Sequence, residues 1–475
     1  MTGAPTGAAL LPRSDATLHR RIARSLAAVE EGHDLRTDAV PGWLAERSRA
    51  HRFEVGRIPF AALDGWYFDD HTGDLRHRTG RFFSIGGLSV TGATGPVPAW
   101  QQPIIDQPEI GILGILAREF DGVLHVLVQA KMEPGNPGLV QLSPTVQATR
   151  SNYTGAHAGA AVRFLEHFTA PDPARVIADV LQSEHGAWFH RKFNRNMLVE
   201  TTADVPAHED FRWLTLGQVA ALLTRDTTVN MDARTVLSCL PAVAPGGPAL
   251  RTDAGLASWL TARRSRHDLA ATRIPLARVT GWERDEYALR RPDDRHFHVV
   301  AVDVRAGSRE VPGWTQPLVA PRGDGLAAFV LRRFDGVPHL LAAAKLEPGL
   351  LHGAEVAPTV QTVPGLWTGE PEERRPPFLR TVLEALSGAD GAGTPGTEVH
   401  HDVVHSEEGG RFLDALTRYV IVELDDERAP LVPPPGFCWV TPAQLSALTG
   451  QGRQVNVAAR TLVAALVLGG RPDAR

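Results

Sequence analysis

The sequence predicts an α+β protein built from two consecutive copies of one domain. Three observations support this prediction. Long segments of the first half recur in the second half, strand-like and helix-like patterns alternate within each half, and 45 glycines and 36 prolines among 475 residues indicate many turns. The length suffices for two large domains or three smaller ones of roughly 150 residues each.

The internal repeat is the most informative of these features. The matching segments occur in the same order in both halves: VPAWQQP (97–103) and VPGWTQP (311–317), REFDGVLH (118–125) and RRFDGVPH (332–339), AKMEPG (130–135) and AKLEPG (344–349), PTVQ (144–147 and 358–361). Solenoid units are only ~20–50 residues long, so repeats of this size indicate a duplicated domain. We place the first domain at 1–243, a Pro/Gly-rich linker at 244–255 and the second domain at 256–475.

The strand predictions rest on aliphatic and β-branched segments. Two of them, 110–119 and 122–132, are joined by the dipeptide Asp121-Gly122, which is typical of a tight hairpin turn. The segment 196–202 predicts a further strand. We therefore expect a mixed or antiparallel sheet flanked by helices in each domain.

The helix predictions rest on apolar residues at helical spacing. This spacing predicts helices over 157–168, 215–224 and 230–240. Thr215 and Asn230 are suitable N-caps for the last two, because their side-chain oxygens accept hydrogen bonds from backbone N–H groups of the first turn.

Charge and cysteine content exclude several classes of protein. The 49 basic residues are balanced by 54 acidic ones, which does not indicate a nucleic-acid-binding surface. Two cysteines, Cys239 and Cys438, are too few for a disulfide framework or a four-cysteine zinc site and fit a reducing compartment. No segment has the ~18–20 apolar residues of a membrane span, and the N-terminus does not resemble a signal peptide. We expect a cytoplasmic protein without nucleic-acid or membrane partners.

Common cofactor motifs are also missing from the sequence. We find no phosphate loop, no dinucleotide-binding glycine motif after a strand and no nucleophile elbow. The histidines of HHDVVH (400–405) fit no standard ligand spacing, and a partly exposed strand is the favoured interpretation. We therefore predict no cofactor and no bound metal.

Two blocks of the first domain resemble the NDP-hexose 2,3-dehydratases of deoxysugar biosynthesis. They are KMEPGNPGLVQLSPTVQATRSNYTGAH (131–157) and LQSEHGAWFHRKFNRNMLVE (181–200). The resemblance includes QQPII (101–105), GILG (111–114) and the duplication, and covers nearly the whole chain.

The resemblance implies a fold and a reaction. Each half is expected to be a Nudix-like domain, and the protein a homodimer. The reaction removes water across C2 and C3 of dTDP-4-keto-6-deoxyglucose and gives a 3,4-diketo-2,6-dideoxy sugar nucleotide. The alternative is a non-catalytic nucleotide-sugar binding protein. A metal-dependent diphosphate hydrolase is disfavoured, because the segment around Glu166 lacks the glutamate-rich Nudix helix.

The two copies differ in polarity, and this difference predicts which of them is catalytic. Thr149–Tyr153 corresponds to Val363–Trp367, and Lys192 corresponds to Ala415. Chemistry on a sugar needs polar groups, so we place the active site in the first domain. The second domain is expected to bind the nucleotide without chemistry, or to serve only as a packing partner.

The candidate site residues follow from this comparison and from the resemblance. The candidates for proton transfer are Lys131, Glu133, Tyr153, His157 and Lys192. The candidates for substrate binding are Trp66, Thr149, Arg150, Ser151, Asn152, Tyr153, Ser183, Trp282, Arg322, Trp367 and Ser406. The sequence does not assign the catalytic base.

Several of these candidates have a structural alternative. Lys131 and Glu133 recur in the second copy and could form a structural ion pair. Trp66 and Trp282 could stack on thymine or be core tryptophans. The pairs Ser183-Glu184 and Ser406-Glu407 could serve a ligand or a sheet, and Thr149–Tyr153 could be an ordinary turn.

Overall fold

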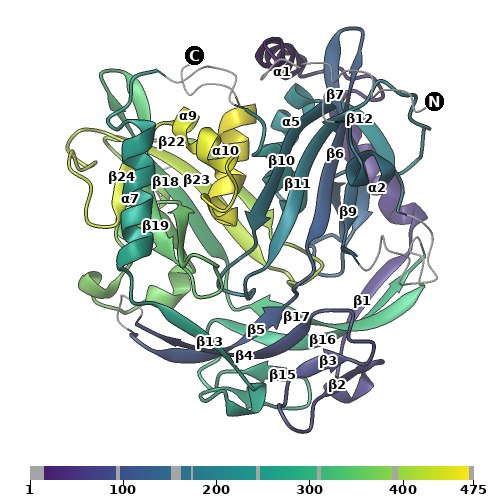
Figure 1. Cartoon of the computed structure of the whole chain (residues 1–475), viewed down its shortest axis with the longest axis vertical. Helices are drawn as coiled ribbons and strands as arrows, with labels where there is room; N and C mark the ends of the chain where they lie inside the picture. Colours follow the sequence, from purple (N-terminus) through teal and green to yellow (C-terminus); the bar gives the residue numbers. More distant parts are fainter. Residues whose placement is uncertain are drawn as a thin grey trace, which may run out of the picture.

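The structure is a computed structural model that describes residues 15–92, 97–150, 162–172, 175–241, 247–307, 312–387 and 394–469. In these residues the strands form four sheets, two of seven strands and two of five. The two large sheets lie side by side in the upper part of Figure 1, and the smaller sheets form the layer below them. The protein is therefore a mixed α and β structure with two related halves.

The first large sheet comes entirely from the first repeat. Its order is β10-β11-β6-β7-β12, with β8 beside β7 and β9 beside β6. The strands are β6 (Gly111–Phe120), β7 (Val123–Met132), β8 (Val140–Ser143), β9 (Val146–Ala148), β10 (Val176–Ser183), β11 (Phe193–Glu200) and β12 (Phe211–Thr215). β11 runs parallel to β6, and the other pairs are antiparallel, so the sheet is mixed as predicted. The predicted hairpin turn is confirmed, because Asp121 and Gly122 have φ values of 50° and 74°.

The second large sheet repeats this topology. Its order is β20-β19-β18-β23-β22, with β21 beside β18 and β24 beside β19. The strands are β18 (Gly325–Phe334), β19 (Val337–Leu346), β20 (Ala354–Ala357), β21 (Val360–Thr362), β22 (Thr397–Ser406), β23 (Leu416–Leu424) and β24 (Phe437–Val440). HHDVVH lies on β22, a partly exposed strand, as expected.

The two small sheets exchange a strand between the repeats. One contains β1 (Phe53–Ile58), β14 (Glu283–Arg284), β15 (Ala288–Arg290), β16 (Phe297–Ala306) and β17 (Gly313–Pro321). The other contains β2 (Trp66–Phe68), β3 (Leu75–His77), β4 (Ser84–Thr91), β5 (Trp100–Asp106) and β13 (Ala270–Ile274). β1 of the first repeat pairs with β16 of the second, and β13 of the second repeat pairs with β4 of the first. The domain limits stay a prediction, but each repeat completes a sheet of the other.

The helices surround and separate the large sheets. They are α1 (Leu18–Ala27), α2 (Val40–Ala50), α4 (Glu166–Thr169), α5 (Leu216–Leu223), α6 (Met231–Leu237), α7 (Asp253–Arg266), α8 (Leu379–Ser387), α9 (Pro442–Thr449) and α10 (Val457–Leu468). The predicted caps are confirmed: Thr215 forms a capping box with Gln218, and Asn230 accepts from the N–H of Ala233. No helix among the described residues is long and apolar enough to cross a membrane.

The helix predicted over 157–168 is wrong in the part that the structure describes. Phe164 has a φ of 62°, which a right-handed helix does not allow, and α4 begins only at Glu166. The Phe164 side chain is buried edge-to-face against Phe211. Packing in the core therefore overrides the local helical pattern. Residues 157–161 lie outside the described part of the chain.

Two buried arginines join the repeats where α6 and α10 meet, and α10 lies between the large sheets in Figure 1. Arg234 on α6 donates to the carbonyl of Ser406 in the second repeat at 2.7 Å. Arg460 on α10 donates to the carbonyl of Ser183 in the first repeat, also at 2.7 Å. Both side chains are fully buried, so these cross-repeat hydrogen bonds satisfy donors that water cannot reach.

Candidate active site

Each repeat docks a Glu-Pro-Gly loop on the Ser-Glu segment of the other repeat. The N–H of Gly135 donates to the carbonyl of Gly409 at 2.8 Å, and the N–H of Gly349 donates to that of Gly186 at 2.7 Å. A Cβ atom on Gly135 would lie 1.6 Å from the carbonyl oxygen of Phe412, so the contact requires glycine. This docking brings polar residues of both repeats together at two related places.

We call these places the first cluster and the second cluster. The first cluster comprises Lys131, Glu133, Asn136, Gln147, Glu184, Lys192, Asn194 and Asp232 of the first repeat with Glu408 and Arg411 of the second. The second cluster contains the equivalent residues Lys345, Glu347, Leu350, Gln361, Glu407, Thr417 and His185. Three of the predicted proton-transfer residues, Lys131, Glu133 and Lys192, thus lie in one cluster.

Glu133 is the best-connected carboxylate of the first cluster. Its Oε1 accepts a hydrogen bond from Nε2 of Gln147 at 2.7 Å and lies 3.8 Å from Nζ of Lys131. Nδ2 of Asn136 lies 3.4 Å from its other oxygen. Lys131 and Glu133 therefore form an ion pair, which is the structural alternative that the sequence left open. Because this ion pair lies inside the first cluster, both residues also remain candidates for the site.

Several buried acceptors of the first cluster have no hydrogen-bond partner among the described residues. Oε1 of Glu184 accepts from Nδ2 of Asn194 at 2.7 Å, but its Oε2 has no such partner. The same holds for the side-chain oxygens Oδ1 of Asn136, Oε1 of Gln147 and Oδ1 of Asp232. Buried acceptors are normally satisfied, so this group is suited to receive donors from a bound molecule or from water.

Glu408 brings a carboxylate of the second repeat into the first cluster. A Cβ atom on Gly410 would lie 3.2 Å from Oε1 of Glu408 and 3.8 Å from Oε1 of Glu133, so the two carboxylates converge. The half-buried Glu408 side chain makes no hydrogen bond or ion pair with a described residue. Burial raises the pKa of Glu408 to about 7; Arg411 opposes this shift, and the charges of Glu184 and Glu133 add to it.

Other groups of the first cluster are shifted by the same environment. Burial lowers the pKa of Lys192, and the charges of Glu184 and Glu408 oppose this shift. Lys192 also donates to the carbonyl of Glu109. Burial raises the pKa of Asp232 well above its ordinary value, and the charge of Glu408 adds to the effect. A cluster of perturbed acids and bases of this kind is typical of sites that transfer protons.

In the second cluster, the carboxylate equivalent to Glu184 is that of Glu407, and both of its oxygens have side-chain partners. Oε1 of Glu407 accepts from the hydroxyls of Thr417 at 2.6 Å and Tyr419 at 2.9 Å, and its Oε2 lies 3.0 Å from Nε2 of His185. Burial would raise the pKa of Glu407, but His185, the charge of Arg234 and the hydrogen bond of Thr417 together outweigh burial and lower it to about 2. Leu350 takes the place of Asn136. His185 and Glu407 consequently form a buried ion pair that serves the structure.

The remaining candidates of the first repeat are only partly described. Ser151, Asn152, Tyr153 and His157 lie outside the described residues. Thr149 is half-buried and Arg150 is exposed, directly after β9. These six residues stay predictions.

The paired tryptophans and serines have internal contacts. The indole N–H of Trp66 donates to the carbonyl of Thr315, and that of Trp282 donates to that of Gln101, both at 2.9 Å. Both rings pack against the apolar core of the lower layer, as in the core interpretation. The hydroxyl of Ser183 bonds to Glu355, and that of Ser406 donates to Gln141 at 2.9 Å across the repeats.

Trp367 lines a surface pocket of the second repeat, whereas Arg322 is exposed and paired with Asp294 at 2.6 Å. The pocket has a volume of about 670 Å³. It is lined by Pro364, Trp367, Thr368, Gly369, Arg375, Leu379, Arg380, Leu383, Glu384, Ser387 and Thr394. The structure thus does not bring Trp282, Trp367 and Ser406 into one contact group.

Sequence reasoning missed Glu408, Arg411 and Asp232. Polar residues that the second copy has lost indicate only residues of the first repeat. Glu408 belongs to the second repeat, so this comparison does not select it. The available signal was the mismatch between His185 and Glu408, which follow the matched Ser-Glu pairs. This mismatch becomes informative only in the tertiary structure, where His185 and Glu408 each lie beside residues of the opposite repeat.

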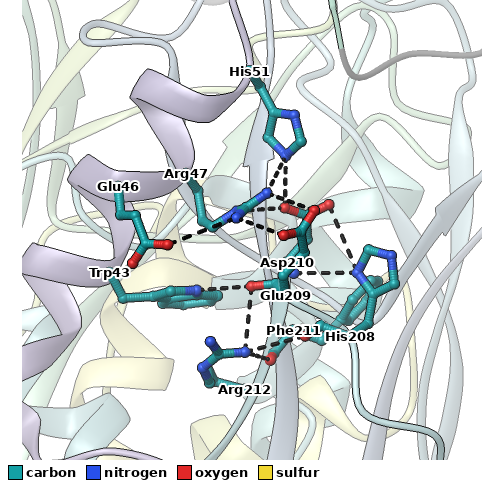
Figure 2. A network of polar contacts seen from close by, with 9 residues as sticks. All are labelled: Trp43, Glu46, Arg47, His51, His208, Glu209, Asp210, Phe211 and Arg212. Atoms are coloured by element: carbon teal, nitrogen blue, oxygen red, sulfur yellow. Dashed lines mark hydrogen bonds and ion pairs between the residues drawn. The ribbon is translucent and has the colours of Figure 1, made fainter.

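Two groups of side chains among the described residues have the spacing of metal ligands. One consists of His51, Glu209 and Asp210, shown in Figure 2. The guanidinium of Arg47 lies among them, 2.8 Å from Asp210 and 3.0 Å from Glu209, and occupies the place of a cation. The other consists of Glu398, His400 and Glu423 on the surface of β22 and β23, where Glu423 also pairs with Arg333 at 2.9 Å. Neither group lies in the first cluster.

Comparison with solved structures adds no support for the predicted fold of each half. A structure described as an ADP compounds hydrolase aligns with 30% of this chain and 69% of its own, at 16% identity and a TM-score of 0.18. That similarity is too low to carry an argument, so the Nudix-like fold stays a prediction.

Comparison with protein families and curated proteins gives a consistent result. The family model for NDP-hexose 2,3-dehydratase matches residues 37–240 and again 253–466. Three curated proteins named dTDP-4-dehydro-6-deoxy-α-D-glucopyranose 2,3-dehydratase are similar to the chain. The one from Amycolatopsis orientalis is 53% identical (97% of this chain, 96% of the relative), that from Streptomyces violaceoruber 47% (89% and 95%), and that from Saccharopolyspora spinosa 46% (89% and 90%). The resemblance inferred from the sequence is confirmed, and the chain belongs to the NDP-hexose 2,3-dehydratase family.

Proposed function

We propose that the chain is a hydro-lyase that removes water across C2 and C3 of dTDP-4-keto-6-deoxy-D-glucose. The names of three relatives that match nearly their full length support this substrate. The observation that carries the proposal is the contrast between the clusters. The first cluster has unsatisfied acceptors and perturbed acids, whereas both oxygens of the equivalent Glu407 are satisfied.

The reaction needs groups of the kind that the first cluster contains. The ketone at C4 acidifies the proton on C3, and the hydroxyl on C2 is β to that ketone. A base removes the proton, a donor stabilises the enolate oxygen, and an acid assists the departing hydroxyl. The resulting enol tautomerises to the 3,4-diketone. Carboxylates and ammonium groups can fill all these roles.

We assign the chemistry to the first cluster and retain the predicted residues. Lys131 and Lys192 supply ammonium donors beside Glu133 and Glu184. Tyr153 and His157 remain predicted participants. A Nudix-like fold for each repeat, a homodimeric assembly and a cytoplasmic location are further parts of this proposal.

The second repeat is proposed to bind a nucleotide without catalysing a reaction. The pocket beside Trp367 supports this, because it combines an aromatic ring with the guanidiniums of Arg375 and Arg380. Trp282 and Ser406, also predicted to bind substrate, are not part of this proposed site, because the indole N–H of Trp282 and the hydroxyl of Ser406 donate to residues of the first repeat.

The decisive experiment traps the product. The purified chain is incubated with dTDP-4-keto-6-deoxyglucose and o-phenylenediamine, which condenses with vicinal diketones but not with the substrate. Mass spectrometry is expected to detect the quinoxaline adduct of a sugar that has lost one water. Release of dTMP without adduct would indicate a hydrolase, and unchanged substrate would indicate a binding protein.

The repeat supplies a matched control for the site. Glu133→Gln and Glu347→Gln remove equivalent buried carboxylates, each paired with a glutamine and lying 3.8 Å from a lysine. We expect Glu133→Gln to lower kcat by about 10²-fold, because it removes the carboxylate that holds the ammonium donor of Lys131 in the first cluster. Glu347→Gln is expected to retain kcat. Equal effects of both substitutions would contradict the assignment to the first cluster.

A further inference from the structure

The proton-transfer pair of the elimination is built across the two repeats. We propose that Glu184 of the first repeat is the base that removes the C3 proton and that Glu408 of the second repeat is the acid that protonates the departing C2 hydroxyl. This inference rests on the proposed dehydratase function and assigns the two roles that the sequence left open.

The internal pseudo-symmetry places these two carboxylates opposite each other. His185 is the residue equivalent to Glu408, and Glu407 is equivalent to Glu184. Nε2 of His185 and Oε2 of Glu407 lie 3.0 Å apart across the repeats. In the first cluster the same arrangement brings a carboxylate to a carboxylate, and the charge of Glu184 acts on Glu408.

The surroundings distinguish the two members of the pair. Oε1 of Glu184 accepts a hydrogen bond from Nδ2 of Asn194. Its Oε2 is buried and has no hydrogen-bond partner among the described residues, so it can accept a proton as a base must. The side chain of Glu408 is half-buried and makes no hydrogen bond to a described residue, so its acidic proton is available to a ligand. Its pKa of about 7 is consistent with a protonated acid near neutral pH.

The charged groups that face Glu408 come from both repeats. They are Arg411 on its own segment and Glu184, Glu133, Lys192 and Asp232 of the first repeat. Burial and the like charges of Glu184 and Glu133 outweigh Arg411 and Lys192 and raise the pKa of Glu408 to about 7, which favours a proton on Glu408.

The pair returns to its starting state after each turnover. Glu184 accepts the C3 proton, and the electrons of the C–H bond form the C3=C4 enolate. As the enolate re-forms the C4 ketone, the C3=C4 electron pair forms the C2=C3 bond, the C2–O bond breaks, and the oxygen takes the proton of Glu408 and leaves as water. The pair begins with one proton on Glu408 and ends with one on Glu184, and transfer between the facing carboxylates resets it.

The test separates the two proton transfers. In D2O, exchange of the substrate C3 proton reports the base, and trapping of the diketone reports elimination. We expect Glu408→Gln to lower elimination by about 10²-fold or more while C3 exchange continues, and Glu184→Gln to abolish both. In the wild type, kcat/KM is expected to fall above pH about 7, the pKa of Glu408.

A second variant guards against a folding defect. Glu408→His copies the residue at the equivalent position of the second cluster, where a buried His–Glu pair is compatible with the fold. It is expected to fold, by thermal unfolding, and to lose both C3 exchange and elimination, because its imidazole would pair with Glu184 as His185 pairs with Glu407. Wild-type turnover in Glu408→Gln, or loss of C3 exchange together with elimination in Glu408→Gln while it remains folded, would overturn the role of Glu408. If the wild type itself forms no diketone, the proposed function fails first, before any variant is compared.

Discussion

His185 and Glu408 occupy equivalent positions in the two repeats, but among the described residues only the side chain of His185 has an ion-pair partner: its Nε2 lies 3.0 Å from the carboxylate of Glu407. Glu408 instead faces the negative charges of Glu184 and Glu133. The difference between histidine and glutamate at this position therefore distinguishes a stabilising ion pair from two carboxylates that repel each other. Such stress is common where acids and bases act on a substrate.

The buried His185–Glu407 pair should make stability depend on pH in a defined way. The pKa of Glu407 is lowered to about 2, so its contribution is present above pH 4.5 and lost as the pH falls toward 2. Burial would lower the pKa of His185, but Glu407 outweighs burial and raises it, so its contribution is present below pH 6.5 and lost as the pH rises through the raised value.

We therefore expect His185→Gln to lower the free energy of unfolding most between pH 4.5 and 6.5, by about 3–5 kcal/mol. Urea unfolding across the pH range measures this difference. Arg36→Gln, which removes an exposed ion pair with Glu31, is the control and should cost less than about 1 kcal/mol. A pH-independent effect of His185→Gln would contradict the ion pair.

The docked glycines should tolerate no side chain. A Cβ on Gly135 would lie 1.6 Å from the carbonyl oxygen of Phe412, and one on Gly349 would lie 1.8 Å from that of Phe189. Either alanine variant is expected to lower the free energy of unfolding by about 3 kcal/mol, at the upper end of the usual cost of overpacking.

Activity should separate these two variants, because Gly135 lies between Glu133 and Asn136 of the first cluster, whereas Gly349 lies between Glu347 and Leu350 of the second. We expect Gly135→Ala to lose kcat and Gly349→Ala to retain it in the folded fraction. Gly42→Ala, at an exposed helical position with open space, should stabilise the chain by up to about 1 kcal/mol. Equal loss of kcat in both docking variants would contradict the difference between the clusters.

Turnover should survive chelation of divalent metals. Lys131, Lys192 and Arg411 already place positive charge among the carboxylates of the first cluster, so the enolate has cationic donors without a metal. Diketone trapping with and without EDTA measures this. Loss of turnover with EDTA that added Mg²⁺ restores would refute the prediction.

Calorimetric titration should reveal a nucleotide site in the second repeat. We expect two dTDP sites per chain in the wild type and one in the double variant Trp367→Ala/Arg375→Ala, because these residues line the pocket of about 670 Å³. The double variant should retain kcat. A single site in the wild type would leave the second repeat as a scaffold that contributes Glu408.

The sequence alone determined the features that depend on neighbouring residues. The turn at Asp121-Gly122 and the caps Thr215 and Asn230 follow from backbone preferences over a few residues, and the structure contains all three. The repeat and the family also follow from the order of residues. Lys192 could be selected because the second copy has alanine there, and Lys131 and Glu133 because they lie in the segment that resembles the family.

Only the tertiary structure decided which residues of different repeats meet. The exchange of β1 and β13, the arginine contacts across α6 and α10, and the entry of Glu408 into the first cluster join positions that lie far apart in the chain. Local propensity does not encode such contacts. They form because exposed strand edges must pair and because buried arginine donors must find acceptors, and in this chain the partners are in the other repeat.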